Sequence, residues 1–196
     1  MPKIIDHDQR RKDIIDVTWR LIVKGGIDAA TMREIANEAG FANGALKHYF
    51  PGKDDIIQGT YERALAMMGE QVARAVGDKH GIEALRAVCL ATAPLDEDAL
   101  TAARVLLSFW ERAVSNDTLH EAYLVHFEDW WQGLARYIAE GREAGEITIQ
   151  RPDDELVDEI VLMNVGSTIM SIIAPNRATP ELMRRHIDDF IDRLNP

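Results

Sequence analysis

This chain of 196 residues has few cysteines, few aromatic residues and fewer basic than acidic residues. The single cysteine, Cys89, cannot form a disulfide within one copy of the chain, which excludes a disulfide-stapled fold. Aromatic residues make up 7%, whereas 46% of all residues are hydrophobic, a proportion typical of soluble globular domains. With 22 Lys and Arg against 33 Asp and Glu the net charge is −11, so the chain as a whole repels polyanions.

Long apolar runs are also missing. The longest uncharged stretch has 17 residues, from Ile160 to Asn176, whereas a helix needs about 20 mostly apolar residues to span a bilayer. The N-terminus carries charges where a signal peptide needs an apolar run. We therefore expect a cytoplasmic protein with no membrane partner.

The acidic charge is unevenly distributed. Residues 1–50 contain 8 Lys and Arg against 7 Asp and Glu, whereas residues 51–196 contain 14 against 26. Nucleic-acid binding depends on the local field at the contact surface and not on the average charge. Only the first quarter of the chain is therefore suited to face a polyanion.

Helical apolar periodicity runs through almost the whole chain, and no segment is a secure strand. Gly25-Gly26 is expected to stop the first helix, Thr31 to Glu34 has the spacing of a capping box, and Thr179-Pro180 is typical of a helix start. The segment 147–150 is interpreted as a connector. The sequence predicts an all-α fold of about nine helices, at 8–24, 31–39, 43–50, 54–76, 82–93, 96–115, 118–144, 153–174 and 180–194.

The helices at 31–39 and 43–50 are close neighbours after a bracing first helix, which is the arrangement of a helix-turn-helix domain. In such a domain the second helix of the pair enters the major groove of DNA. An inward face of Leu46, Tyr49 and Phe50 leaves three residues outside. A helical hairpin with a solvated outer face fits the periodicity equally well. The outward residues, which could approach or read base edges and phosphates, are Gly44, Lys47 and His48.

The 27 residues from Thr31 to Ile57 resemble the signature of the TetR family of bacterial transcriptional repressors. The resemblance implies a three-helix DNA-binding domain at 1–52 and an all-helical ligand-binding and dimerisation domain at 53–196. It departs from the common pattern at Ala42, where a serine cap is usual, and at Lys47, where tyrosine is usual. By this resemblance the DNA-contacting positions are Thr31, Asn43, Lys47, Tyr49 and Lys53, the last two mostly on phosphates.

A basic cluster of Arg10, Arg11 and Lys12 precedes the first helix's apolar face. In the TetR family such segments often reach the DNA backbone or the minor groove. A solvated helix start fits the same residues equally well.

Seven of the 13 aromatic residues lie within the 29 residues from 109 to 137, with acids interleaved at Glu111, Glu121, Glu128 and Asp129. Aromatic faces beside carboxylates suit a cationic or quaternary ammonium ligand. The region also resembles, more distantly, the choline-sensing branch of betaine regulators. The alternative, that these aromatics form the core, is the commoner case. The candidate ligand-binding residues are Phe109, Trp110, Phe127, Trp130, Trp131, Asn164 and Thr168.

The helix at 153–174 is uncharged on every side beyond Ile160, so it must be covered all round. Together with the last helix, it is expected to form a four-helix bundle with a second copy of the chain. Small polar residues on this helix either line a ligand pocket or let helices approach closely. The residues predicted for the dimer interface are Leu162, Ile169, Ile187, Phe190, Ile191 and Leu194.

These patterns predict a homodimeric regulator that binds a palindromic DNA operator and is released by a small-molecule effector, with no cofactor and no metal. An enzyme is the second class considered, but no nucleophile, phosphate-binding or metal motif occurs, and His120 and His126 lie about 240° apart on a helix. A third class is a helical protein-binding adaptor, which would use the uncharged segment for a foreign partner.

Overall fold

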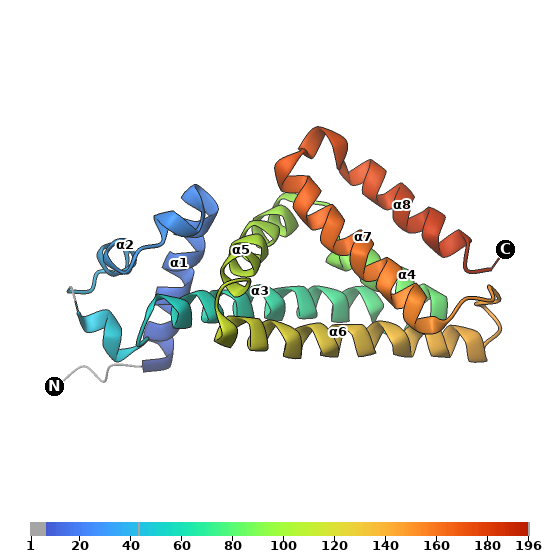
Figure 1. Ribbon diagram of the computed structural model, residues 1–196, viewed down its shortest axis with the longest axis horizontal. Helices are drawn as coiled ribbons and strands as arrows, with labels where there is room; N and C mark the ends of the chain where they lie inside the picture. The colour runs from blue at the N-terminus through green and yellow to red at the C-terminus, as the bar shows by residue number, and fades with distance from the viewer. Residues whose placement is uncertain (1–6, 43, 196) are drawn as a thin grey trace. The chain divides into compact units, whose positions relative to one another are not determined.

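The computed structural model describes residues 7–42 and 44–195 and is all-α, with no strand in these residues (Figure 1). The predicted fold class is confirmed, and the helix η1 occupies the place of the third predicted helix. The α-helices are α1 (His7–Ala29), α2 (Met32–Glu38), α3 (Lys53–Val76), α4 (Gly81–Thr92), α5 (Glu97–Ala113), α6 (Asp117–Glu143), α7 (Asp153–Ile173) and α8 (Pro180–Asp192), and the 3-10 helices are η1 (Ala45–His48) and η2 (Pro175–Arg177).

Local sequence signals set several helix ends. α1 loses helical geometry at Gly25 and Gly26, and the φ of Gly26 is 71°, a left-handed value that glycine adopts at little cost. The hydroxyl of Thr31 caps α2 by accepting a hydrogen bond at 3.1 Å from the backbone N–H three residues on. Thr179 caps α8 in the same way at 3.3 Å, with Pro180 in the first turn. The two threonine caps are confirmed, and the glycine pair kinks α1 where a stop was predicted, although the helix continues to Ala29.

The chain divides into two compact units, and the divisions fall inside α3, α5 and α6. Unit 1 contains the described residues up to Ala66 together with Arg104–Ala122. Unit 2 contains Met67–Ala103 and the described residues from Tyr123 onwards. Parts of three longer helices therefore belong to the same compact unit as the N-terminal helices.

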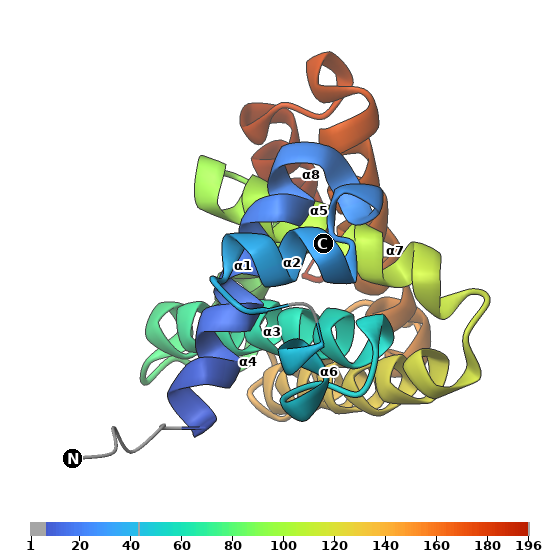
Figure 2. The ribbon, with the colours of Figure 1, turned by 90° about the vertical axis from the view of Figure 1, so that its left-hand side faces the viewer.

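The core of unit 1 joins the N-terminal helices to α3 and α5 (Figure 2). Ile14 of α1 and Ile35 of α2 are fully buried, and Leu46 and Phe50 enter from η1 and the turn after it. Val105 of α5 completes this core at 2% exposure. Each fully buried side chain of this size contributes about 1.5–3 kcal/mol, so α5 helps to stabilise the unit that carries η1.

The core of unit 2 is built by α4, α6, α7 and α8, with a contribution from the end of α3. α4 packs against both α7 and α8. The segment 147–150 is a connector, as predicted, and two of its backbone N–H groups donate to the carbonyl of Leu194 at 2.9 and 3.2 Å. Arg142 braces the same loop by donating to the carbonyls of Ile149 and Arg151.

α7 begins at Asp153, as predicted, seven residues before the uncharged stretch, and ends at Ile173. Among the described helices it alone is long and apolar enough, by length and composition, to cross a membrane. The core helix of a soluble protein meets the same criterion. Leu156, Val157, Ile160 and Val161 of α7 are buried in the core of unit 2.

Candidate nucleic-acid interface and effector site

The second helix of the predicted pair is a single 3-10 turn, η1. Gly44 precedes it with φ at 100°, so the backbone conformation itself favours glycine there. Leu46 is 2% exposed and points into the core, whereas Lys47 and His48 are exposed. The element therefore has the two faces that the sequence suggested, although it is shorter than the predicted helix.

The basic cluster of α1 is largely engaged with the protein itself. Arg10 lies 3.9 Å from a carboxylate oxygen of Asp13. Arg11 donates a hydrogen bond to the backbone carbonyl of Tyr49, and its guanidinium lies 4.1 Å from the centre of the Phe50 ring. Two of the three cations thus have protein partners that neither sequence interpretation included.

The positions implied to contact DNA also have intramolecular roles. Thr31 is exposed and caps α2. The ammonium group of Lys53 donates to the carbonyl of Ile27 at 3.0 Å and so ties α3 to the last turn of α1, beyond its glycine kink. Tyr49 is half-buried, and Asn43 lies outside the described residues.

A polar cluster that sequence reasoning missed joins α3 to α5 and α6 within unit 1. Arg112 donates to both carboxylate oxygens of Asp54, at 2.9 and 3.1 Å, and Asn116 donates to the same carboxylate at 2.8 Å. Hydrogen bonding to Asp54 raises the pKa of Arg112. The side-chain oxygen of Asn116 accepts from the N–H of Leu119 at 3.1 Å and so caps α6. Arg112 and Asn116 are 58 and 62 residues from Asp54 in the chain, so no local sequence pattern predicts these contacts.

The aromatic residues of unit 1 fall into two kinds. Phe109 is 1% exposed and stacks on Tyr61, with ring centres 3.7 Å apart and an interplanar angle of 6°. It is a core residue, as the alternative interpretation held. Trp110 differs, because its indole N–H is buried without an acceptor among the described residues. A buried donor left unpaired costs free energy, so this group suits an acceptor supplied from outside.

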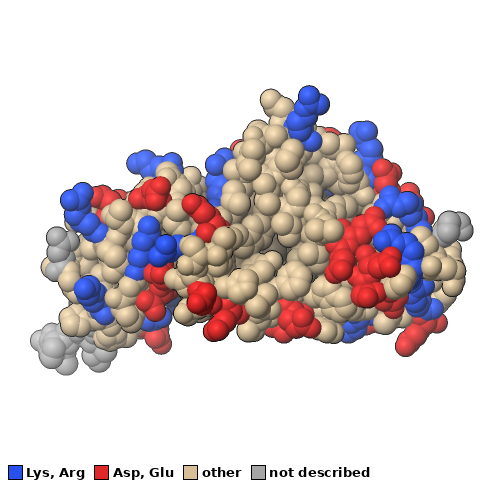
Figure 3. All heavy atoms as spheres, viewed as in Figure 1, with Lys and Arg blue, Asp and Glu red and all other residues tan. Residues whose placement is uncertain are grey.

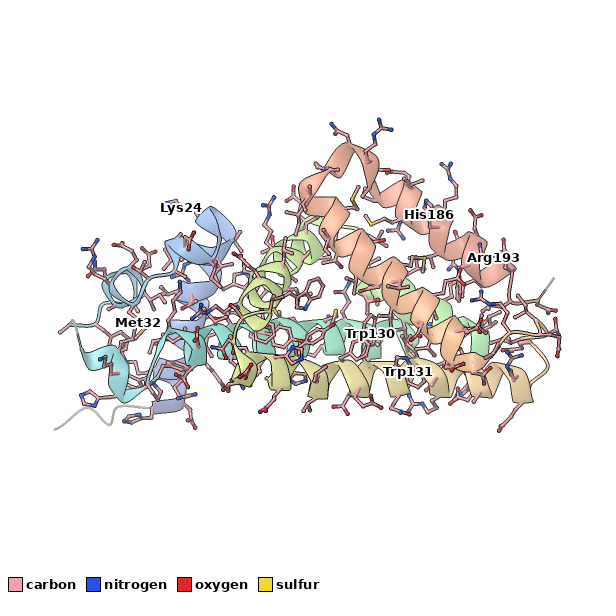
Figure 4. All side chains as sticks on the ribbon, viewed as in Figure 1. Lys24, Met32, Trp130, Trp131, His186 and Arg193 are labelled. Atoms are coloured by element: carbon pink, nitrogen blue, oxygen red, sulfur yellow. The ribbon has the colours of Figure 1, made fainter. Side chains whose placement is uncertain are left out.

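The candidate aromatic residues of unit 2 lie on α6, and the two tryptophans are labelled in Figure 4. Phe127 packs edge-on against Trp130, with ring centres 6.4 Å apart. The indole N–H of Trp130 is buried and finds no acceptor in the described part of the chain. Trp131 donates its N–H to Asp158 of α7 at 3.1 Å, so its polar atom is already used.

The carboxylates between the aromatics do not accompany them. Glu111, Glu121, Glu128 and Asp129 are all exposed, because at these positions the helices turn their acidic faces to solvent. Phe127 and Trp130 are only partly buried, and the prediction of a cationic ligand stays a prediction. Ring faces attract such a cation without help from these four acids.

Of the two polar candidates on α7, Asn164 binds a neighbouring helix and Thr168 is buried. Asn164 donates to the carbonyl of Thr92 at 3.1 Å and to its hydroxyl at 3.0 Å, which joins α7 to α4. Thr168 is 3% exposed. Cys89, beside Asn164 in a narrow cavity, has its thiol pKa raised to about 12 by burial, which is typical of an inert core cysteine.

The residues predicted for a dimer interface separate in the structure. Leu162 on α7 is 73% exposed, and Ile169 is half-buried. The apolar stripe that runs along α8 to Leu194 packs into the core of unit 2, and its part in a dimer interface stays a prediction. This stripe consists of Ile187, Phe190, Ile191 and Leu194, which are 1–9% exposed.

Comparisons with known proteins agree with this architecture. Residues 14–59 match the model for bacterial regulatory proteins of the tetR family, and residues 81–196 match that for the BetI-type transcriptional repressor C-terminal domain. The HTH-type transcriptional regulator BetI 1 of Chromohalobacter salexigens is 30% identical over 195 residues, covering 98% of this chain and 93% of that protein. PksA of Bacillus subtilis, also an HTH-type transcriptional regulator, is 26% identical over 195 residues, covering 99% and 94%.

The fold is shared with solved structures of low sequence identity. A transcriptional regulator from Saccharomonospora viridis, determined in complex with choline, superposes with a TM-score of 0.85 at 23% identity, covering 94% of this chain and 96% of that one. A TetR transcription regulator from Haloarcula marismortui gives 0.84 at 16% identity, covering 95% and 98%. The chain therefore belongs to the TetR family: it is a helix-turn-helix transcriptional regulator with a ligand-binding C-terminal domain of the BetI type.

Proposed function

We propose that this regulator is a cytoplasmic repressor that binds a palindromic operator as a homodimer and releases it when a small effector binds. The observation that carries the DNA-reading part is the two-faced η1, with Leu46 in the core and Lys47 and His48 exposed. Two such elements in a dimer would enter major grooves about 34–36 Å apart, one turn of the duplex, or somewhat farther.

We assign base reading to Gly44, Lys47 and His48, and backbone contacts to Thr31, Asn43, Tyr49 and Lys53. Lysine has three donors on its ammonium group. Lys53 can therefore keep its hydrogen bond to the carbonyl of Ile27 and still donate to a phosphate. Lys47, in contrast, is exposed on η1, where it is suited to a guanine edge.

For the homodimer we propose the outer side of α7 as the contact. Leu162, Met170 and Ile173 are 73%, 41% and 69% exposed, and with Ile169 they recur at helical spacing on one side of α7. Beside them, a groove of about 570 Å³ between α7 and α8 is lined by both acidic and basic residues, and Figure 3 shows acidic and basic atoms side by side on unit 2. An apolar stripe with a mixed-charge border is typical of a protein interface.

For the effector we propose a small quaternary ammonium compound such as choline, bound at Trp130. Ring faces attract such cations, and Trp130 and Phe127 present two aromatic rings at a right-angled contact. The unpaired indole N–H of Trp130 would donate to an oxygen of the ligand. The related structure from Saccharomonospora viridis contains choline, and several relatives are BetI regulators, which supports this ligand class.

Coupling between effector and DNA would pass through the helices that both units share. α5 contributes Val105 to the core around η1, and Arg112 and Asn116 hold Asp54 in the first turn of α3. A shift of α5 would therefore act on the reading element through packing and through this polar cluster. Such coupling is typically about 1–3 kcal/mol, or 5- to 150-fold in affinity.

The relatives are transcriptional regulators, and we propose no catalytic activity for this chain. The remaining alternative is a helical adaptor that uses α7 for a foreign partner. It predicts a monomer in isolation and no sequence-selective DNA binding.

The first test is selection from a library of random DNA duplexes at physiological salt by the purified full-length protein, with light scattering to measure its mass. Enrichment of a palindrome by a dimer, reversed by choline, supports the proposal. A folded protein that enriches no sequence contradicts it. Enrichment that choline does not reverse contradicts the effector class alone.

A further inference from the structure

We propose that Arg11 is a positioning residue for base reading, and that its guanidinium holds the C-terminal end of η1 instead of neutralising a phosphate. This inference rests on the proposed use of η1 to read DNA. It concerns a residue that composition alone would place with the phosphate-binding cations.

The reading element has little helical structure to hold its shape. It is a single 3-10 turn of four residues. The backbone bonds at its ends include Ala45 N to Ala42 O at 3.0 Å, Lys47 N to Gly44 O at 3.3 Å, and Tyr49 N and Phe50 N to Leu46 O, each at 3.0 Å. The last carbonyls of such a turn have no partner within the helix and need one from elsewhere.

Arg11 supplies that partner from α1. It donates to the carbonyl of Tyr49, the residue directly after η1, and its Cζ lies over the Phe50 ring, 4.1 Å from the ring centre. Phe50 is 1% exposed and fixed in the core of unit 1. The Arg11 side chain therefore connects the buried ring of Phe50 to the backbone at the C-terminal end of η1.

Neighbouring residues of α1 hold the same end. His7 contacts the Tyr49 ring, with centroids 4.9 Å apart, and Phe41 contacts it edge-on at 5.3 Å. Arg10 lies over the ring of Phe41 at 5.6 Å. The first turns of α1 thus form a brace against the residues that follow Lys47 and His48, and Arg11 contributes a hydrogen bond to the backbone there.

The chemistry of this contact requires arginine. A guanidinium is planar and can stack on an aromatic ring while its N–H groups donate in the ring plane, whereas an ammonium is a compact point charge. Arg11→Lys therefore keeps the charge and loses the planar group that lies over Phe50. A phosphate contact, by comparison, tolerates this exchange far better.

The experiment compares Arg11→Ala, Arg11→Lys and, as matched control, Lys12→Ala, which removes a neighbouring exposed charge. Each full-length variant is measured on the duplex that wild type selects from the random library and on the same duplex with single base changes, at several salt concentrations. Circular dichroism and thermal melting identify variants that are folded. A wild type that selects no duplex contradicts the proposed function and not this inference.

We expect both Arg11 variants to lose roughly tenfold in discrimination between the selected duplex and the changed ones, with the salt slope unchanged. The loss is confined to the base pairs that Lys47→Ala also affects, and Arg11→Ala adds little in a Lys47→Ala background. Mere loss of stability would weaken all duplexes alike.

The opposite pattern overturns the proposal. If Arg11 contacts a phosphate, Arg11→Ala lowers the salt slope by about 0.9 and weakens every duplex equally. In that case Arg11→Lys keeps most of the wild-type affinity and salt slope, and neither variant changes discrimination. If the control Lys12→Ala shows the same loss of discrimination, the loss comes from removing positive charge from this segment and not from removing the Arg11 contact.

Discussion

The candidate functional residues of unit 1 lie on its surface, whereas those of unit 2 lie largely in its interior. In unit 1, Lys47 and His48 are exposed and the core behind them is apolar. In unit 2, Thr168 is buried, and so is the indole nitrogen of Trp130. A polyanion is read from outside by exposed donors, whereas a small ligand must be enclosed by apolar walls. The difference teaches that helices in one chain can present donors to a polyanion in one unit and enclose a small ligand in the other.

The contrast also concerns the origin of the contacts. The reading element of unit 1 depends on residues close in sequence, such as Gly44 and Leu46, and on a few distant braces such as Arg11. The candidate effector residues of unit 2 depend on distant pairings, such as Trp131 with Asp158 and Asn164 with Thr92. Variants of each unit should therefore fail in different ways.

The largest expected effect concerns the stripe of α8. Phe190→Ala should lower the free energy of unfolding by about 3–5 kcal/mol because it empties a fully packed site, as measured by urea denaturation. His186→Ala, exposed on the same helix, is the control and should change stability by less than about 0.5 kcal/mol. A small loss of stability accompanied by dissociation of the dimer would show that this stripe lies in the dimer interface.

The second effect separates base reading from charge in unit 1. Lys47→Ala should change which bases are preferred, by about 1–3 kcal/mol at one position. Lys53→Ala should weaken all sequences alike and reduce the salt slope by about one unit. Both are measured by fluorescence anisotropy on the selected duplex and its single-base variants. Equal effects of both variants on every sequence would remove Lys47 from base reading.

The third effect tests unit 2. Trp130→Phe keeps an aromatic face and deletes the unpaired N–H, so choline should bind about fivefold more weakly, the value of one ordinary hydrogen bond. Trp131→Phe is the matched control, because its N–H is already bound by Asp158. Calorimetric titration gives both affinities. A larger loss in the control than in Trp130→Phe would move the ligand to the α7 side of α6.

The smallest effect concerns the N-cap threonine that begins a helix in each unit. Thr31→Ala and Thr179→Ala each remove a helix N-cap and should each cost about 1 kcal/mol of unfolding free energy, measured by denaturation. Only Thr31→Ala should also weaken DNA binding, since Thr179 lies in unit 2. An equal loss of DNA affinity in both variants would mean that the effect is global stability alone.

The sequence predicted more of unit 1 than of unit 2. The capping threonines, the glycine stop of α1 and the faces of η1 follow from residues within one or two turns of each other. The roles of Phe109 and the α8 stripe could not be predicted, because a buried apolar residue gives the same pattern whether it faces a core, a ligand or a second copy. The exposure of the interleaved acids was missed for the related reason that helix rotation is set by packing.

By itself, the sequence determined the helical fold, its start and stop signals, and the segment from Thr31 to Ile57 that carries the family signature. These are local properties, fixed by side-chain spacing and backbone preference. Only the tertiary structure decided that Arg11 supports the end of η1, that Asp54 meets Arg112 and Asn116, and that Trp130 keeps an unpaired donor. These pairings join residues far apart in the chain, and their geometry exists only after the helices have packed.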